Sequence, residues 1–238
     1  RVDACEGPVV ALATGLGEQN RQFAFATHHL AVDVVSWGIL LEDLLASVAD
    51  PDVRLPPKSV PFPTWTADLV RHVERGGFRA QVPYWIDLAR RAGTAGALFA
   101  EEQVARGETE AEVVRLAEAD ATVVFDTARE TYGLDPARTL VAVIARAMAT
   151  WTARDEILFT LEGHGREPFG DHHDVSRTVG WFTSTFPHMI TVAGGIDGTV
   201  ESVRRSFERL PDKGFGFGPL LRFAPALGGG GRRPPTDP

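Results

Sequence analysis

The sequence predicts a mixed α/β (α+β) fold, because strand-like and helix-like segments follow one another without the regular alternation of a doubly wound sheet. Two short apolar runs, 8–13 and 22–27, are flanked by glycine, asparagine and charged residues. They predict an antiparallel pair of strands joined by residues 15–21. Three further strands are predicted from the apolar runs at 108–116, 157–161 and 182–192.

A helix is predicted directly after the first pair of strands. Ser36 is a suitable N-cap, and apolar residues continue at helical spacing to Val48. Asp50 precedes Pro51 and ends this helix, because a residue before proline is disfavoured in the helical conformation. The expected apolar face comprises Ile39, Leu40, Leu44, Leu45 and Val48.

Five more helices are predicted further along the chain. One of them places Tyr84, Trp85 and Leu88 on its inner face and is followed by a loop at 93–96. Another begins with a proline at its first position, directly after Asp135. The five segments are 64–74, 82–92, 119–132, 136–151 and 199–210.

Proline and glycine indicate how the chain is divided. Five prolines between residues 51 and 63 predict a stiff connector, which is the candidate boundary between two lobes. The polar, Gly/Pro-rich end at 228–238 predicts a disordered tail. A length of 238 residues fits one large domain or two small lobes, with a sizeable core.

Composition and charge argue against several classes of function. The net charge of −8 argues against nucleic-acid binding, which needs clustered lysine and arginine. Cys5 is the only cysteine, so an internal disulfide is excluded, as suits a reducing cytoplasm. Because no signal peptide or membrane-spanning apolar run is present, we expect a cytoplasmic protein. The first residue is Arg1, so we expect either a piece of a longer polypeptide or a processed chain.

Two adjacent histidines, His28 and His29, follow the second predicted strand. Neighbouring side chains at a strand end point in opposite directions, so one imidazole faces a cleft while the other packs inward. Histidine exchanges protons readily near neutral pH. Asp33 is expected to bond back to the loop or to an arginine. The alternatives are a pair without chemistry or a metal site, although no third strong ligand lies at a motif spacing.

A second ionisable cluster is the hexapeptide Glu-Gly-His-Gly-Arg-Glu at 162–167. It places two carboxylates, an imidazole and a guanidinium within six residues, directly after a predicted strand. The two glycines permit an unusual backbone and the close approach of a ligand. The alternative is a solvated turn with a local ion pair.

Two other clusters point less clearly to a site. Residues 171–174 (Asp-His-His-Asp) resemble a metal cluster, but consecutive loop residues do not converge on one ion unaided, so a solvated segment is expected. The glycines at 214–218 suggest a phosphate loop but lack the Lys-Ser/Thr ending of that motif.

Four ordered motifs carry a resemblance to a known family. Residues 28–37 resemble the His-His-x-x-x-Asp-Gly-x-Ser-Trp signature of the condensation-domain superfamily. Residues 162–167 match the hexapeptide that distinguishes epimerization domains of non-ribosomal peptide synthetases. Residues 176–187 resemble the Arg-Thr-Val-Gly-Trp-Phe-Thr-Ser element, and residues 211–218 resemble Pro-x-x-Gly-x-Gly-Tyr-Gly, with Phe217 in place of tyrosine. Residues 55–59 and Tyr84-Trp85 also look like family positions.

The resemblance implies a two-lobed, chloramphenicol-acetyltransferase-like condensation fold that is truncated at both ends. On this basis residues 1–55 are the C-terminal part of the first lobe and carry the histidine motif. Residues 56–224 are the N-terminal part of the second lobe, and 225–238 are a disordered tail.

The resemblance also implies a reaction. Epimerization domains invert the α-carbon of an aminoacyl or peptidyl thioester that is carried on the phosphopantetheine of a carrier protein. His29 and Glu162 are then the catalytic residues, and either can be the base. Their supports are His28, Asp33, His164 and Arg166. No metal or directly bound cofactor is expected. The expected partners are a peptidyl carrier domain and other synthetase modules, with no nucleic acid and no membrane.

One residue departs from the family pattern. Val34 stands where the family usually has glycine, and a positive φ there would strain a β-branched residue. Val34 and the missing ends of the family domain support one alternative to an epimerase, an inactive remnant or a module that docks a carrier domain. The other alternative is a condensation catalyst that forms peptide bonds, which shares the histidine motif but not the hexapeptide.

Overall fold

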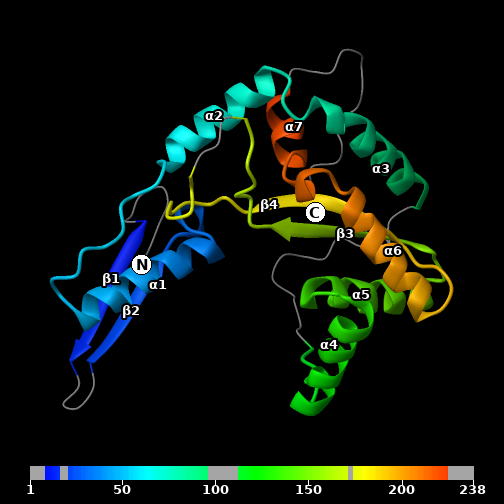
Figure 1. Cartoon of the computed structure of the whole chain (residues 1–238), viewed down its shortest axis with the longest axis horizontal. Coiled ribbons are helices and arrows are strands. Elements are labelled where there is room, and N and C mark those ends of the chain that lie inside the picture. The colour runs from blue at the N-terminus through cyan, green and yellow to red at the C-terminus, as the bar shows by residue number, and fades with distance from the viewer. Residues whose placement is uncertain (1–8, 17–20, 96–111, 171–173, 225–238) are drawn as a thin grey trace. The chain divides into compact units, whose positions relative to one another are not determined.

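The computed structural model describes residues 9–16, 21–95, 112–170 and 174–224, and these residues form the mixed fold that the sequence predicts (Figure 1). The chain divides into two compact units. Unit 1 comprises Arg1–Ala80, Glu162–Thr185 and Phe215–Gly229, and unit 2 comprises Gln81–Leu161, Phe186–Gly214 and Gly230–Pro238. The proline-rich connector lies inside unit 1, so the lobe boundary after residue 55 remains a prediction. The predicted tail at 225–238 lies outside the described residues.

Unit 1 begins with the predicted strand pair. Strands β1 (Val10–Leu16) and β2 (Arg21–Thr27) are antiparallel, with Val10 opposite Thr27. The backbone N–H of His28 donates to the carbonyl of Val9 at 2.8 Å and continues the pairing past the end of β2. A short 3₁₀ helix, η1 (His29–Ala31), follows immediately. The histidine pair therefore sits where the strand becomes a turn.

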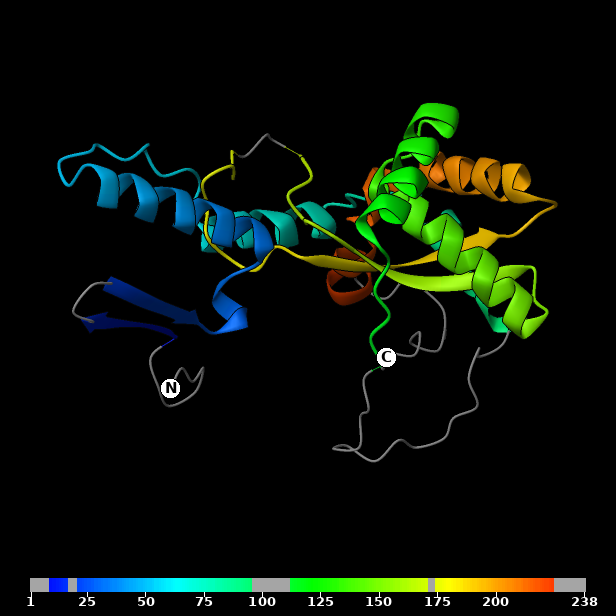
Figure 2. The same cartoon turned by 90° about the horizontal axis from the view of Figure 1, so that it is seen from below.

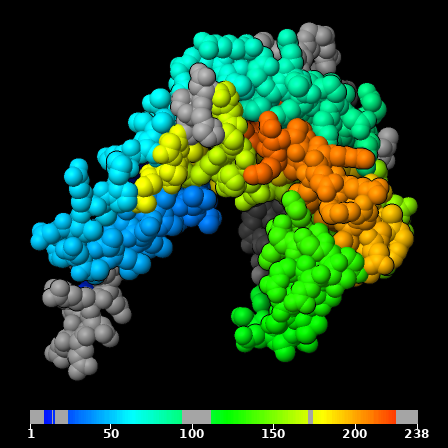
Figure 3. Space-filling view, viewed as in Figure 1, coloured from blue at the N-terminus to red at the C-terminus, as the bar shows by residue number. Residues whose placement is uncertain are grey.

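Helix α1 (Val34–Ala49) ends at Asp50 as predicted but begins two residues before Ser36. The N-cap is Asp33, whose side chain accepts from the backbone N–H of Ser36, so the predicted Ser36 cap was wrong. The apolar face is only partly buried: Ile39 is covered, whereas Leu45 and Val48 are exposed. Helix α1 accordingly lies at the surface in Figure 3.

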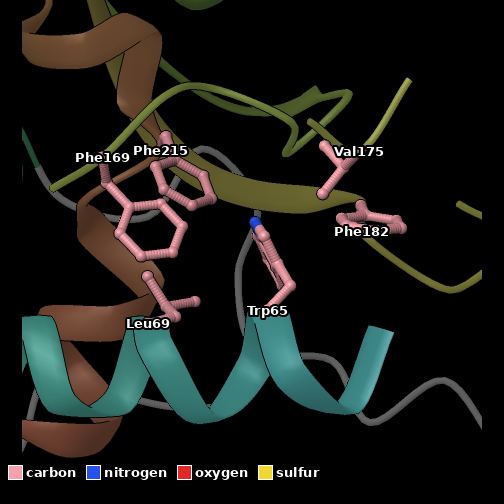
Figure 4. Packing of buried hydrophobic residues seen from close by; sticks show 6 residues of the cluster. All are labelled: Trp65, Leu69, Phe169, Val175, Phe182 and Phe215. Atoms are coloured by element: carbon pink, nitrogen blue, oxygen red, sulfur yellow. The ribbon is translucent and has the colours of Figure 1, made fainter. Parts of the chain in front are cut away.

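The core of unit 1 forms on helix α2 (Phe62–Glu74). Trp65 of this helix meets the ring of Phe182 at 4.6 Å and that of Phe169 at 5.8 Å between centroids (Figure 4). Edge-to-face aromatic pairs contribute about 1 kcal/mol each beyond their burial. The short helix α7 (Phe217–Phe223) also contacts α2. Phe169, Val175 and Phe182, from the loops between residues 164 and 183, are thereby packed against α2. The buried cluster comprises Trp65, Leu69, Phe169, Val175, Phe182 and Phe215.

Unit 2 contains most of the remaining helices. The 3₁₀ turn η2 (Arg79–Gln81) enters helix α3 (Val82–Ala95), in which Trp85 and Leu88 are buried as predicted. Residues 93–95 are still helical, so the predicted loop begins too early. Helices α4 (Glu118–Tyr132) and α5 (Pro136–Thr152) confirm their predicted segments.

The predicted strand at 108–116 is wrong in its described part, residues 112–116. These residues are exposed and have no regular structure. No described strand pairs with them, so they have no partner for strand hydrogen bonds. Residues 108–111 lie outside the described part.

Strands β3 (Glu156–Gly163) and β4 (Ser184–Thr191) form a two-stranded sheet and run side by side in Figures 1 and 2. The N–H of Val192 donates to the carbonyl of Asp155 at 2.7 Å, which joins the end of β4 to the start of β3, as in an antiparallel pair. Helix α6 (Ile196–Arg209) and the turn η3 (Pro211–Gly214) complete unit 2. The sheet packs with α5 and α6 around Val141, Ala142, Ala145, Ile190 and Val203. No helix in the described ranges is long and apolar enough to cross a membrane.

Candidate active site

The hexapeptide at 162–167 leaves strand β3 and turns sharply at Gly165. This glycine is buried, has a φ of +67°, and a Cβ on it would lie 1.6 Å from the carbonyl oxygen of Phe182. Any side chain here would therefore meet both a disfavoured backbone conformation and a backbone atom. The two glycines predicted the close approach of a ligand, but at Gly165 the neighbour is the backbone of Phe182. This contact fixes the turn and so the direction in which Arg166 leaves it.

Arg166 is buried and connects three segments of unit 1. Its guanidinium donates to the carbonyls of Val175 at 2.8 Å and Thr178 at 2.9 Å. The other terminal nitrogen donates to Asp33 Oδ1 at 3.2 Å and to the hydroxyl of Ser36 at 3.0 Å. The guanidinium carbon also lies 3.8 Å from the ring centre of Phe182. Arg166 thus joins the hexapeptide, the start of α1 and the loop at 175–178.

Asp33 is the acidic partner, and only 2% of its side chain is exposed. Burial opposes its ionisation. The hydrogen bonds from Ser36 and from the backbone N–H of Phe182, together with Arg166, outweigh burial, so the pKa of Asp33 lies below its usual value. Asp33 is therefore a carboxylate that holds a helix N-terminus and an arginine together. The prediction that it bonds to the loop or to an arginine is confirmed for both.

Ser36 completes this centre instead of capping the helix with its side chain. Its hydroxyl donates to the carbonyl of Gly180 at 2.9 Å and accepts from the N–H of Gly180 at 3.1 Å. Asp33 Oδ2 accepts from the N–H of Phe182 at 3.1 Å. The segment at 180–182 is therefore fixed on both sides of Trp181 by the start of α1.

The two histidines have different surroundings. Nδ1 of His28 accepts from the backbone N–H of Leu30 at 3.2 Å, so this imidazole caps the turn η1. His29 is the first residue of that turn, and its side chain is exposed. The inward-packing neighbour is thus His28, half-buried, while His29 is available to a substrate. The roles of support for His28 and catalytic residue for His29 remain predictions.

Trp181 is the site residue that sequence reasoning missed. Its ring lies 5.2 Å from the imidazole of His29, centroid to centroid, with 53° between the planes. The signal was present in the sequence, since Trp181 stands inside the third family motif, but nothing local links it to a histidine 152 positions earlier. Only the fold brings the two rings together.

Glu162 and His164 lie at the end of β3. Glu162 is exposed. Nδ1 of His164 accepts from the N–H of Arg166 at 3.0 Å, so its other nitrogen, Nε2, carries the proton and donates to Glu167 at 3.1 Å. His164 is therefore held in one tautomer by its neighbours. The part of the chain that the structure describes records no direct contact between Glu162 and His29, although both belong to unit 1.

Val34 causes no strain. It is the first residue of α1, its φ is not positive, and its side chain is 84% exposed. The positive φ that would have strained a β-branched residue is therefore not required here, because the helix begins directly after Asp33.

No cluster of three metal-ligating side chains is found within the described ranges. Three of the four residues of the Asp-His-His-Asp segment, 171–173, lie outside them. The glycine-rich stretch at 214–218 enters helix α7 through Gly214, which is buried with a φ of +87°. A Cβ there would meet the ring of Phe186 at 2.3 Å, so this glycine serves packing.

The fold and these motifs together define a class. The family model of the condensation domain matches residues 5–228, and the chain belongs to this family. One of the subunits of plipastatin synthase from Bacillus subtilis (strain 168) is 31% identical over 224 residues, which is 90% of this chain and 9% of that relative. One of the subunits of linear gramicidin synthase from Brevibacillus parabrevis is 33% identical over 210 residues, covering 82% of this chain and 4% of that relative.

Solved structures confirm the predicted condensation fold. The epimerization domain from the third module of tyrocidine synthetase B has a TM-score of 0.75 at 24% identity. The match covers 94% of this chain and 53% of that domain. The first condensation domain of the calcium-dependent antibiotic synthetase has a TM-score of 0.56 at 20% identity, over 86% of this chain and 48% of the other. This chain thus spans about half the length of the solved domains.

Proposed function

We propose that this chain epimerizes the α-carbon of an aminoacyl or peptidyl thioester during non-ribosomal peptide synthesis. The observation that carries the proposal is the hexapeptide at 162–167. Its first glutamate, Glu162, is exposed, while the side chain of Arg166 is only 8% exposed and pairs with Asp33 of the histidine motif. The two motifs needed for the reaction are thereby joined through one ion pair.

The chemistry requires two groups that handle protons. A thioester acidifies its α-hydrogen, so a side-chain base removes that proton and a second group returns one to the opposite face. His29 and Glu162 are both exposed, one in each motif, and supply these groups. Either is the base, according to the direction of inversion. A positioned general acid or base contributes about 10²- to 10⁴-fold to the rate.

The four supporting residues keep these groups in place. His28 caps the turn that carries His29, and His164 bonds within the hexapeptide. Asp33 and Arg166 fix the start of α1 to the loops after β3. The substrate arrives on the phosphopantetheine of a peptidyl carrier domain in the cytoplasm, and the proposal needs neither a metal nor a directly bound cofactor.

Deuterium exchange tests the proposal. The chain is mixed in deuterated water with carrier protein loaded with L-phenylalanine, and α-deuterium is followed by mass spectrometry. We expect exchange that is lost in Glu162→Gln and His29→Gln. Glu208→Gln, at an exposed carboxylate of α6, is the matched control and retains exchange. Exchange that persists in Glu162→Gln and His29→Gln would refute the assignment.

A second candidate is peptide-bond formation, which the family model of the condensation domain favours. Two loaded carriers are incubated with the chain, and a dipeptidyl product without α-exchange supports this candidate. Carrier binding without either product supports the third candidate, a piece that docks a carrier domain without chemistry.

A further inference from the structure

Among the described residues, the exposed imidazole of His29 has one aromatic neighbour, and it comes from a distant motif. His29 lies in a 3₁₀ turn of three residues, and its ring makes no hydrogen bond to any described residue. Its contact is with the indole of Trp181, at 5.2 Å between ring centres. A side chain held only by its own turn samples several rotamers, whereas proton transfer needs a defined direction.

The backbone on both sides of Trp181 is fixed. Gly180 exchanges two hydrogen bonds with the hydroxyl of Ser36, and Phe182 donates to Asp33. Space around Gly180 is also closed, since a Cβ there would approach the ring of Phe62 to 2.5 Å. The indole therefore projects from a rigid segment.

The anchors of Trp181 and the origin of His29 share the same residues. Asp33 and Ser36 follow the turn that carries His29, and they also hold residues 180–182. The positions of both rings are thus fixed by the same short stretch of chain. The indole remains 42% exposed, so part of its surface lies open beside the imidazole.

We propose that Trp181 is the positioning residue of His29: its indole is a wall that selects the imidazole orientation used in proton transfer. The proposal rests on the proposed function of His29 as a proton-transfer group. It predicts that removal of the indole slows the chemical step and leaves binding of the loaded carrier unchanged.

The test combines a spectroscopic and a kinetic measurement on the 238-residue chain. Histidine rings are labelled with carbon-13, and the His29 signal is identified by its absence in His29→Gln. We expect Trp181→Leu to shift the His29 ring signal, because the ring current of the indole is lost. We also expect kcat for α-deuterium exchange to fall by about ten- to a hundredfold with an unchanged KM, and Trp181→Phe to restore most of both.

Trp151→Leu is the matched control, because Trp151 is an exposed tryptophan of α5 in unit 2 and should leave both measurements unchanged. Circular dichroism and thermal melting identify a variant that fails to fold, in which case Trp181→Phe is compared with wild type. A His29 signal that Trp181→Leu does not move overturns the proposal, as does a raised KM with unchanged kcat. If the wild type itself shows no exchange, the proposed function fails, while the ring signal still decides whether Trp181 holds His29.

Discussion

Unit 1 and unit 2 each bury ionisable side chains, but the numbers of hydrogen-bond partners of these side chains differ. In unit 1 the Asp33–Arg166 pair is almost fully paired: its carboxylate accepts from two backbone N–H groups and from the guanidinium. In unit 2 the fully buried His188 has one partner, the hydroxyl of Ser206 at 3.1 Å. That hydroxyl donates to the carbonyl of Val203, so it must accept from Nε2 of His188.

Nδ1 of His188 is left as a buried acceptor without a partner among the described residues. Burial lowers the pKa of His188 to about 4, so the ring is neutral when folded. The difference teaches that a buried charge persists where a network offsets its desolvation cost, and that a buried imidazole without such a network gives up its charge.

The largest expected effect comes from breaking the ion pair. Arg166→Met leaves the Asp33 carboxylate buried without its cation and should destabilise the fold by about 3–5 kcal/mol. Urea unfolding at neutral pH measures this. The control is Arg204→Met, which removes an exposed partner of Glu201 and should destabilise the fold far less, because water and salt screen an exposed ion pair. Equal losses in the two variants would show that the buried pair contributes no more than a surface pair.

The next effect is the acid sensitivity of His188. Its folded pKa lies below its unfolded value of 6.5, so its contribution is complete above pH 6.5 and is lost as pH falls toward 4. The loss is about 3 kcal/mol over this window. His188→Leu should reduce the pH dependence of the unfolding free energy between pH 6.5 and 4.5. Urea unfolding at several pH values measures this dependence. An unchanged slope would mean that His188 is protonated in the folded state.

A smaller loss of stability is expected at the turn before Arg166. Two glycine variants distinguish the cost of backbone conformation from the cost of close contact. Gly165→Ala adds a Cβ at positive φ against the Phe182 carbonyl and should cost at least about 2 kcal/mol. Gly133→Ala, at a φ of +64° with no atom within 4 Å, should cost only about 1 kcal/mol. Thermal unfolding of both variants gives the difference. Similar values would mean that the Phe182 contact relaxes freely.

The smallest expected effect is at the position where the sequence departs from its family. Val34→Gly removes an exposed side chain from the first turn of α1 and introduces a flexible residue. It should destabilise the chain by less than about 1 kcal/mol and leave α-deuterium exchange unaltered. A marked gain in exchange would show that valine does impair the turn.

Local signals predicted those elements whose ends are fixed by neighbouring residues. Helix α5 is an example: Pro136 follows Asp135, whose side chain accepts from the N–H of Arg138 at 2.8 Å. The Ser36 cap failed for a distant reason. Asp33 and Ser36 are both good caps, and the serine hydroxyl is instead bound to Gly180, 144 residues later.

The same distinction applies to the candidate site. A bond from Asp33 to the loop or to an arginine was expected, because both residue types stand within the motifs, and Arg166 is that arginine. The contact between His29 and Trp181 was not, because ring packing depends on tertiary structure. Residues 112–116 were predicted as strand from apolar content alone, yet a strand needs a neighbour to bond with.

The ion pair between Asp33 and Arg166 spans 133 positions of sequence. During synthesis on a ribosome, the histidine motif therefore emerges long before the arginine that will neutralise its aspartate. At about 5–20 residues per second, several seconds separate the two. Throughout that interval the Asp33 carboxylate has no guanidinium to pair with, so the start of α1 cannot be tied to the loop after β3 until Arg166 has been made.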